Sequence, residues 1–233
     1  EDVQIAGGVE HMHHIPMEAG FSASPRLYFR NSPAVMQMGL TAENLALRYR
    51  VSRKEQDEFA YRSHMKAASA TDSGAFRAEV IPTWGRDDEG RKRLLTVDQC
   101  IRRDTTPEAL AALKPAFMPE GGTVTAGNSS PLNVGAAALL IMSEEKARAL
   151  GLKPMARIRA MAVAGVDPSV MGIGPVPATL KALQRAKLTL ADIGLIELNE
   201  AFAAQALSVI KGLKADPEKV NVHGGAIAIG HPL

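Results

Sequence analysis

The hydrophobic and polar positions divide the chain into two kinds of sequence. Residues 3–9 (VQIAGGV) and 135–142 (GAAALLIM) are nearly continuous apolar runs, which are typical of buried strands. Further apolar runs occur at 157–166 and 194–198. Residues 17–118 are instead polar and are often interrupted by turn residues. This contrast predicts a core of four buried strands and a separate lobe, 17–118, with few strands of its own.

Capping residues indicate where helices begin. Ser52 and Glu55 form a capping box, which predicts a helix that continues to about Ala70. Thr106 followed by Pro107 predicts another helix start, because proline fits the first helical position. The remaining patterns predict a loop or an edge hairpin over 84–94, and helices over 144–150, about 177–187 and about 200–213. Strands and helices alternate in the second part of the chain, so we expect an α/β fold.

The composition narrows the possible functions without naming one. Of 233 residues, 46% are hydrophobic and 22% are charged, as in an ordinary globular protein. The net charge of +2 is too small to indicate nucleic acid or a membrane surface as a partner. No apolar run is long enough to span a bilayer. A single cysteine excludes an internal disulfide framework and fits a reducing compartment. The chain opens on Glu1, and we expect both ends to lie inside a longer protein.

Two stretches contain candidate catalytic residues. Asn199 lies where a predicted strand leads into a helix, a position that faces the ligand crevice of α/β proteins. It is either a helix N-cap or a group that holds a water or a substrate oxygen. His231 stands between Gly230 and Pro232 at the end of a glycine-rich stretch. It is either structural or a general base or oxyanion donor, and the second role requires a nucleophile beside it.

Two other features, a group of histidines and the single cysteine, give weaker indications of a functional site. His11, His13 and His14 invite a metal site, and strand alternation puts the first two on one face. No acidic residue or cysteine completes a ligand set at a known spacing, so we expect no metal. Cys100 has Arg102 nearby, and Arg103 follows it; these cations could lower the pKa of the thiol. No base is aimed at it, so a bystander is the favoured interpretation.

Six segments together resemble a known family. GGVEHM, MGLTAENLA, GTVTAGNSSPLNVGAAALLIMSE, VDPSVMGIGPVPA, LNEAFAAQAL and NVHGGAIAIGHPL occur in the same order as in thiolases and extend over the whole chain. GGVEHM and ELNEAFAAQ resemble the degradative 3-ketoacyl-CoA thiolases of β-oxidation more than the biosynthetic type. One residue departs from the family: His223 stands where an asparagine is usual.

The resemblance implies roles for individual residues. His231 would activate a nucleophilic cysteine and bind the thioester oxygen, and Asn199 would hold a water in the same oxyanion hole. Neither family cysteine is in this chain: we expect the nucleophile before Glu1 and the acid/base cysteine after Leu233, and Cys100 matches neither. Positions that match substrate and coenzyme A contacts are Met38, Arg102, Phe117, Ala126, Ser130, Leu132, Met171, Ala201 and Phe202.

The implied fold is the α/β thiolase fold, with two similar halves packed in five layers and a loop domain inserted in the first half. It is incomplete in this chain. Residues 1–16 and 119–153 would belong to the N-terminal domain, 17–118 to the inserted domain that covers coenzyme A, and 154–233 to the start of the C-terminal domain.

The implied reaction is cleavage of a 3-ketoacyl-CoA by CoA to acetyl-CoA and a shortened acyl-CoA. The alternatives are a biosynthetic acetyl-CoA C-acetyltransferase and a non-catalytic acyl-CoA-binding subunit. Coenzyme A would be a substrate, and no cofactor or metal is expected. The partners would be CoA and acyl-CoA, with a homodimer or homotetramer and, as an option, a β-oxidation multienzyme complex. The location would be cytoplasmic in a bacterium, and mitochondrial or peroxisomal in a eukaryote.

Overall fold

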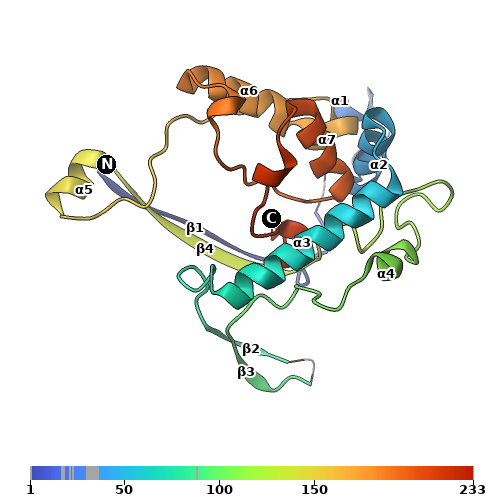
Figure 1. Ribbon diagram of the computed structural model, residues 1–233, viewed down its shortest axis with the longest axis horizontal. Helices are drawn as coiled ribbons and strands as arrows, with labels where there is room; N and C mark the ends of the chain where they lie inside the picture. Colours follow the sequence, from blue (N-terminus) through green and yellow to red (C-terminus); the bar gives the residue numbers. More distant parts are fainter. Residues whose placement is uncertain are drawn as a thin grey trace.

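A computed structural model describes residues 2–16, 19–20, 22, 24–29, 37–87 and 89–232 (Figure 1). The outer bounds Glu1 and Leu233 of the expected domains, and parts of the expected 17–118 lobe, lie outside the described residues. The strands are β1 (Val3–His11), β2 (Thr83–Arg86), β3 (Lys92–Leu95) and β4 (Val134–Met142). The helices are α1 (Pro25–Tyr28), α2 (Met38–Tyr49), α3 (Arg53–Ser73), α4 (Pro107–Ala111), α5 (Glu144–Ala149), α6 (Pro175–Ala186), α7 (Ala203–Leu213) and α8 (Ala226–Ile229). Within the described ranges, the 3₁₀ helices are η2 (Pro168–Ile173), η3 (Leu190–Asp192) and η4 (Pro217–Lys219).

The capping signals located the helix starts correctly. Ser52 and Glu55 form the predicted capping box at the start of α3, which continues to Ser73. The Thr106 hydroxyl caps α4, and Pro107 occupies its first position. Ser143 caps α5 in the same way. α7 begins at Ala203, three residues after the predicted start, because the preceding residues form a loop.

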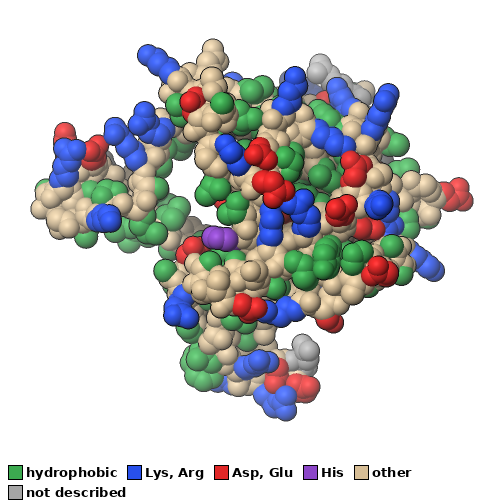
Figure 2. All heavy atoms as spheres, in the orientation of Figure 1, with side chains coloured by type: hydrophobic (Ala, Val, Ile, Leu, Met, Phe, Trp, Pro, Cys, Tyr) green, Lys and Arg blue, Asp and Glu red, His purple; other side chains and the backbone are tan. Residues whose placement is uncertain are grey.

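The predicted strands at 3–9 and 135–142 exist, but their predicted burial is wrong. β1 and β4 form an antiparallel ribbon with Val3 opposite Met142 and His11 opposite Val134. Ile5 is 79% exposed and Leu139 is 67% exposed. The two strands pair only with each other in the described part of the chain, and most of their residues are exposed. The ribbon projects from the body as an arm (Figure 1), and Figure 2 shows hydrophobic side chains along it.

The other two predicted strands do not form. Residues 157–166 have no ladder partner and run as irregular chain beside α6. Side chains of α6 donate hydrogen bonds to backbone carbonyls of this segment. Lys181 Nζ donates to the Val163 carbonyl at 2.9 Å, and Arg185 Nη1 donates to the Met161 carbonyl at 2.6 Å. Within 194–198, only Ile196 makes a bridge, parallel to Val220. The predicted edge hairpin over 84–94 is confirmed as the β2–β3 pair.

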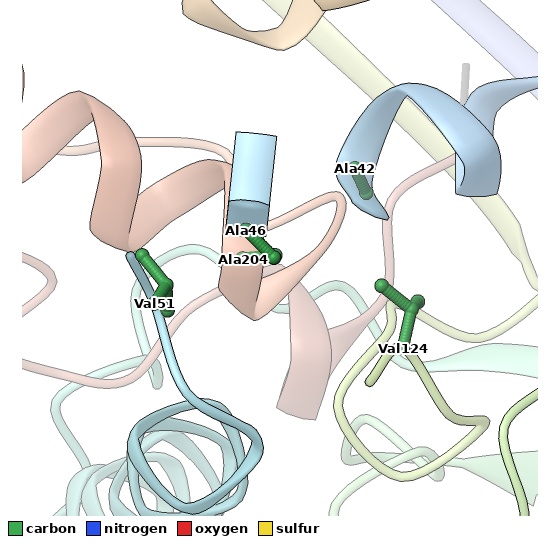
Figure 3. Close-up of a cluster of buried hydrophobic side chains, with 5 residues drawn as sticks. All are labelled: Ala42, Ala46, Val51, Val124 and Ala204. Atoms are coloured by element: carbon green, nitrogen blue, oxygen red, sulfur yellow. The ribbon is translucent and has the colours of Figure 1, made fainter. Parts of the chain in front are cut away.

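The helices of residues 17–118 are in close contact with the rest of the chain. α2 packs against η2 and α7, and α3 packs against α7 and α8, which belong to the second part of the chain. A buried apolar cluster joins the two parts, and Figure 3 shows its side chains pointing toward one another. Its members are Ala42, Ala46, Val51, Val124 and Ala204. Since these residues are small, the helices approach closely.

One face of α3 consists of small residues that recur at helical spacing, including Ala60, Ser63 and Ala67. The glycine-rich stretch before α8 lies directly on this face. A Cβ atom at Gly224 would lie 2.5 Å from the Ser63 carbonyl oxygen, and Gly224 also has a φ of +79°. Glycine is therefore required there by space and by backbone conformation. None of the helices in the described ranges is long and apolar enough to cross a membrane.

Candidate active site

Asn199 lies in the loop between the Ile196 bridge and α7, and its side chain is exposed. The N-cap of α7 is Phe202, three residues further on, with no side-chain capping bond. The N-cap interpretation of Asn199 is therefore wrong. Its side chain is free of a helix-capping role and remains a candidate for contact with water or substrate.

A second loop, residues 128–133, pairs with the Asn199 loop. The Ser130 amide donates to the Ala201 carbonyl at 3.0 Å, and the Ala203 amide donates to the Asn128 carbonyl at 2.9 Å. Ser129 and Phe202 form an antiparallel bridge between these bonds. The structure thus brings together two predicted site residues, Ser130 and Ala201.

The same loop also holds His231. The His231 amide donates to Asn133 Oδ1 at 3.1 Å. Gly230 has a φ of +100°, and a Cβ there would lie 2.0 Å from Asn133 Nδ2. The Gly230 backbone therefore packs directly against the Asn133 side chain. His231 is half-buried and follows the short helix α8. Residues 226–229 of this helix pack against α3. No hydrogen bond between the Asn199 and His231 side chains occurs in the described structure, so their convergence stays a prediction.

Phe117 and Phe202 form a second group of site residues. Their rings meet edge to face at a centroid distance of 5.9 Å. A Cβ at Gly39 would lie 2.2 Å from the Phe117 ring, so the start of α2 supports this aromatic pair. Met38, beside Gly39, is 38% exposed. Met171 in η2 and Leu132 are also exposed.

Arg102 and Ala126 line a cavity of about 200 Å³, together with His64, Cys100 and Ser129. The Arg102 amide donates to His64 Nδ1 at 3.1 Å. Burial of His64, and then the charge of Arg102, lower the pKa of this histidine to about 4. His64 is therefore neutral at pH 7 and accepts the hydrogen bond that fixes this loop.

Cys100 lies in the same cavity and is half-buried. Burial raises the pKa of the Cys100 thiol, the charge of Asp98 raises it further, and the charge of Arg102 only partly opposes them. The sequence left open whether nearby arginines activate this thiol. The net effect raises the pKa of the thiol instead of lowering it, which agrees with a bystander role.

The sequence analysis missed the buried carboxylate next to Asn199. Glu200 is 1% exposed. It accepts hydrogen bonds from Ser63 Oγ at 2.6 Å, Asn221 Nδ2 at 2.8 Å and the Ile227 amide at 3.1 Å. Burial raises the pKa of the Glu200 carboxyl, and these hydrogen bonds partly offset the effect. The sequence signal was an acidic residue directly after Asn199, at the position predicted as the start of a helix.

Two further buried polar groups that the sequence analysis missed hold residues 122–130 in place. Glu43 is 2% exposed and accepts hydrogen bonds from the backbone amides of Thr123 and Val124. Asn128 donates to Asp57 at 2.9 Å and accepts from the Thr125 amide at 2.8 Å. Because unpaired buried polar groups are costly, these bonds fix the conformation of the loop that leads to Ser130.

The remaining histidines lie outside these groups. The rings of His11 and His14 stack at a centroid distance of 3.6 Å, and His13 meets His11 edge to face. No group of three residues suited to hold a metal ion occurs among the described residues. His223 is exposed, and its ring packs edge to face on Phe76 at 5.8 Å.

Comparison with known proteins agrees with these features. The model of the thiolase N-terminal domain matches residues 1–145, and that of the thiolase C-terminal domain matches residues 152–233. A 3-ketoacyl-CoA thiolase of Pectobacterium carotovorum is 59% identical over an alignment of 235 positions. The alignment covers 100% of this chain and 61% of the relative. The chain spans about 60% of the length of the curated relatives that it matches.

Two solved structures show the same fold over 100% of the chain. The dimeric peroxisomal thiolase of Saccharomyces cerevisiae is 39% identical, with a TM-score of 0.89 and 59% of its own chain covered. The acetyl-CoA acetyltransferase of Bacillus anthracis is 43% identical, with a TM-score of 0.85 and 61% of its chain covered. The predicted α/β thiolase fold is thereby confirmed, and the chain belongs to the thiolase family.

Proposed function

We propose that the whole protein is a 3-ketoacyl-CoA thiolase, which cleaves its substrate with CoA to acetyl-CoA and a shortened acyl-CoA. The similarity to the 3-ketoacyl-CoA thiolase of Pectobacterium carotovorum supports this substrate class. The cleavage expels an acetyl-CoA enolate, so negative charge develops on a thioester oxygen. Donors that are already in place where this charge develops lower the barrier, and loss of one typically costs ~10²–10³ in rate.

In this proposal, two groups of the chain act on the reacting atoms. His231 donates to the thioester oxygen and serves as the base for a nucleophilic thiol. Asn199 holds a water that donates to the same oxygen. The acyl group must meanwhile be carried by a cysteine sulfur, and the raised pKa of Cys100 argues against that residue. The thiolate and the second proton-transferring thiol would come from the rest of the whole protein.

The observation that carries the proposal is the loop of residues 128–133. It bonds to the Asn199 loop through Ser130 and Ala201, and to His231 through Asn133. Two candidate donors that are far apart in the sequence are therefore attached to one short segment. Attachment of this kind supports catalysis, because reactive groups must be held within a fraction of an ångström of the productive geometry.

The same proposal assigns a path for the acyl-CoA. Ser130 would contact the pantetheine arm, Phe117 would lie nearer the mouth of the pocket, and Arg102 would approach the nucleotide end. The cavity shared by Arg102 and Ala126 supports a binding role for this part of the chain. The remaining proposed contacts are Met38, Leu132, Met171, Ala201 and Phe202.

Two alternatives differ in the reaction. A biosynthetic acetyl-CoA C-acetyltransferase is favoured by the similarity to the Bacillus anthracis enzyme of that name. A non-catalytic acyl-CoA-binding subunit would need neither Asn199 nor His231, since binding alone requires no oxyanion donors. The presence of both residues supports an enzyme.

We also propose the domain division and assembly that the family resemblance implies. Residues 1–16 and 119–153 would belong to the N-terminal domain, 17–118 to the inserted domain and 154–233 to the C-terminal domain. The whole protein would be a homodimer or homotetramer, with a β-oxidation complex as a further option. Its location would be cytoplasmic in a bacterium, and mitochondrial or peroxisomal in a eukaryote.

The direct test is an assay of the whole protein in both directions. For thiolysis, purified protein would receive CoA with either acetoacetyl-CoA or a longer 3-ketoacyl-CoA, and acetyl-CoA would be quantified. For condensation, it would receive acetyl-CoA alone, and acetoacetyl-CoA would be quantified. The proposal expects efficient thiolysis of the longer substrate. Preference for acetoacetyl-CoA and for condensation would favour the biosynthetic alternative. Tight acyl-CoA binding without turnover would favour the non-catalytic alternative.

A further inference from the structure

Three hydrogen bonds reach the Glu200 carboxylate from three separate segments. Ser63 lies on α3, Asn221 lies in the loop after η4, and Ile227 lies in α8. All three partners donate, so the carboxylate accepts at both oxygens and is suited to its ionised form. The carboxylate therefore joins the loop that carries Asn199 to the helix that leads to His231.

The link to α8 has two branches. The Ile227 amide donates directly to Glu200 Oε2. The Gly225 amide donates to Ser63 Oγ at 3.0 Å, and that hydroxyl donates to the same carboxylate oxygen. Two backbone amides at the start of α8 are thus satisfied by Glu200 or through Ser63. A Cβ at Gly225 would lie 2.3 Å from Glu200 Cδ, so these groups are in close contact.

The link to the Asn199 loop is equally direct. The Asn221 side chain accepts from the Leu198 amide and donates to the Leu198 carbonyl, with both distances at 2.8 Å. This pair of bonds fixes the orientation of the Asn221 amide, and its Nδ2 also donates to Glu200. The residues on both sides of Asn199, Leu198 and Glu200, are therefore held by one hydrogen-bonded network.

We propose that Glu200 is a positioning residue that sets Asn199 against His231, acting with Ser63 as the bridge to α8. The inference rests on the proposed function, since it assumes that both groups act on the thioester oxygen. α8 has only four residues and ends immediately before Gly230, so any shift of its start is passed on to His231. A misplacement of about 1 Å can cost 10²-fold in rate.

The test uses the whole protein with two substitutions of different severity. Ser63→Ala removes the bridging hydroxyl but leaves the carboxylate in place. Glu200→Gln keeps one acceptor oxygen and directs an amide N–H toward the Asn221 donor. We expect kcat to fall by ~10-fold for Ser63→Ala and by up to ~10²-fold for Glu200→Gln. KM for the acyl-CoA should change by less than about threefold, because the proposed pantetheine contacts lie on another loop.

Each substitution has a control on the same element. Ser69→Ala changes an exposed serine of α3, and Glu197→Gln changes an exposed glutamate of the Asn199 loop. Both controls should retain kcat within about twofold, as expected for surface positions. Two outcomes would overturn the proposal. In the first, kcat falls only in proportion to the loss of folded protein, and in the second, KM rises as much as kcat falls. Either would mean that the role of Glu200 is purely structural.

A double substitution separates this inference from the proposed function. If Ser63 acts through His231, Ser63→Ala should add little to the loss of kcat already caused by His231→Ala. Full additivity of the two losses would contradict the inference. If His231→Ala alone left kcat unchanged, the proposed function itself would fail, whatever Ser63→Ala does.

Discussion

The backbone N–H of His231 is held by the Asn133 side chain at 3.1 Å, across a contact in which Gly230 leaves no room for a side chain. Asn133 follows Ser130 on the loop that also bonds to the Asn199 loop. The position of His231 is therefore determined by the same segment that contacts the other candidate donor.

Replacement of Asn133 tests this relationship. Asn133→Ala removes the acceptor for the His231 amide, and a lost hydrogen bond of this kind is worth about 1 kcal/mol. We expect kcat for thiolysis to fall by roughly 5-fold, since 1.4 kcal/mol corresponds to a factor of ten. Asn133→Asp keeps an acceptor and should retain most of the activity. Equal losses for both substitutions would show that the hydrogen bond is not what matters.

Gly39 tests the support of the aromatic pair. A Cβ at this position would lie 2.2 Å from the Phe117 ring, so Gly39→Ala forces the ring away from Phe202. We expect a loss of about 1–3 kcal/mol in the free energy of unfolding, as for an overpacked site. Urea denaturation measures it. In the Phe117→Ala background, Gly39→Ala should cost much less, and an undiminished cost would rule out the clash as its cause.

The pH dependence of stability tests the burial of His64. Its pKa is about 4 in the folded protein, against an ordinary 6.5, so the unfolded chain binds the extra proton first as the pH falls. The contribution of the neutral histidine is complete above pH 6.5 and is lost between pH 6.5 and about 4. At ~1.4 kcal/mol per unit, this loss amounts to about 3 to 4 kcal/mol.

His64→Asn removes the titration while keeping an acceptor near the Nδ1 position. The stability of this variant should vary less with pH in that window, as measured by urea unfolding at several pH values. His13→Asn, at an exposed histidine, is the control and should leave the pH dependence unchanged. An unaltered slope for His64→Asn would mean that His64 is not the group responsible.

Cys100 is expected to be dispensable for catalysis. Burial and Asp98 raise the pKa of its thiol, so little thiolate forms at neutral pH. Cys100→Ser should leave kcat of the whole protein within about twofold, a normal range for a position without a role in the chemistry.

We also expect no thiolysis by the 233-residue chain alone, because the reaction requires a positioned thiolate. Cleavage by that chain, abolished by Cys100→Ser, would reverse this assignment.

Local sequence signals located the starts of α3, α4 and α5 correctly and predicted the strands poorly. Ser52, Thr106 and Ser143 cap the helices at the positions predicted, because a capping bond depends only on residues close in sequence. Apolar runs, in contrast, show that a segment can be buried and not what covers it. β1 and β4 pair with each other and stay exposed, while 157–166 bonds to side chains of α6 instead of to a strand.

The candidate site was predictable only in part, for the same reason. Asn199 and His231 were found from their flanking residues and from the resemblance to thiolases. Their supports were missed, because Ser63 and Glu200 are 137 positions apart in sequence and form a pair only in the fold. No pattern along the chain links such partners.

The rate of thiolysis by the whole protein after His231→Ala is the most direct measurement of the proposed function. We predict a fall in kcat of at least ~10², as for loss of a general base, with CoA affinity nearly unchanged. Asn199→Ala should cost less, because a displaced water can be partly replaced. An unchanged kcat together with weakened CoA binding would contradict the catalytic role of His231 and would favour a protein that only binds acyl-CoA.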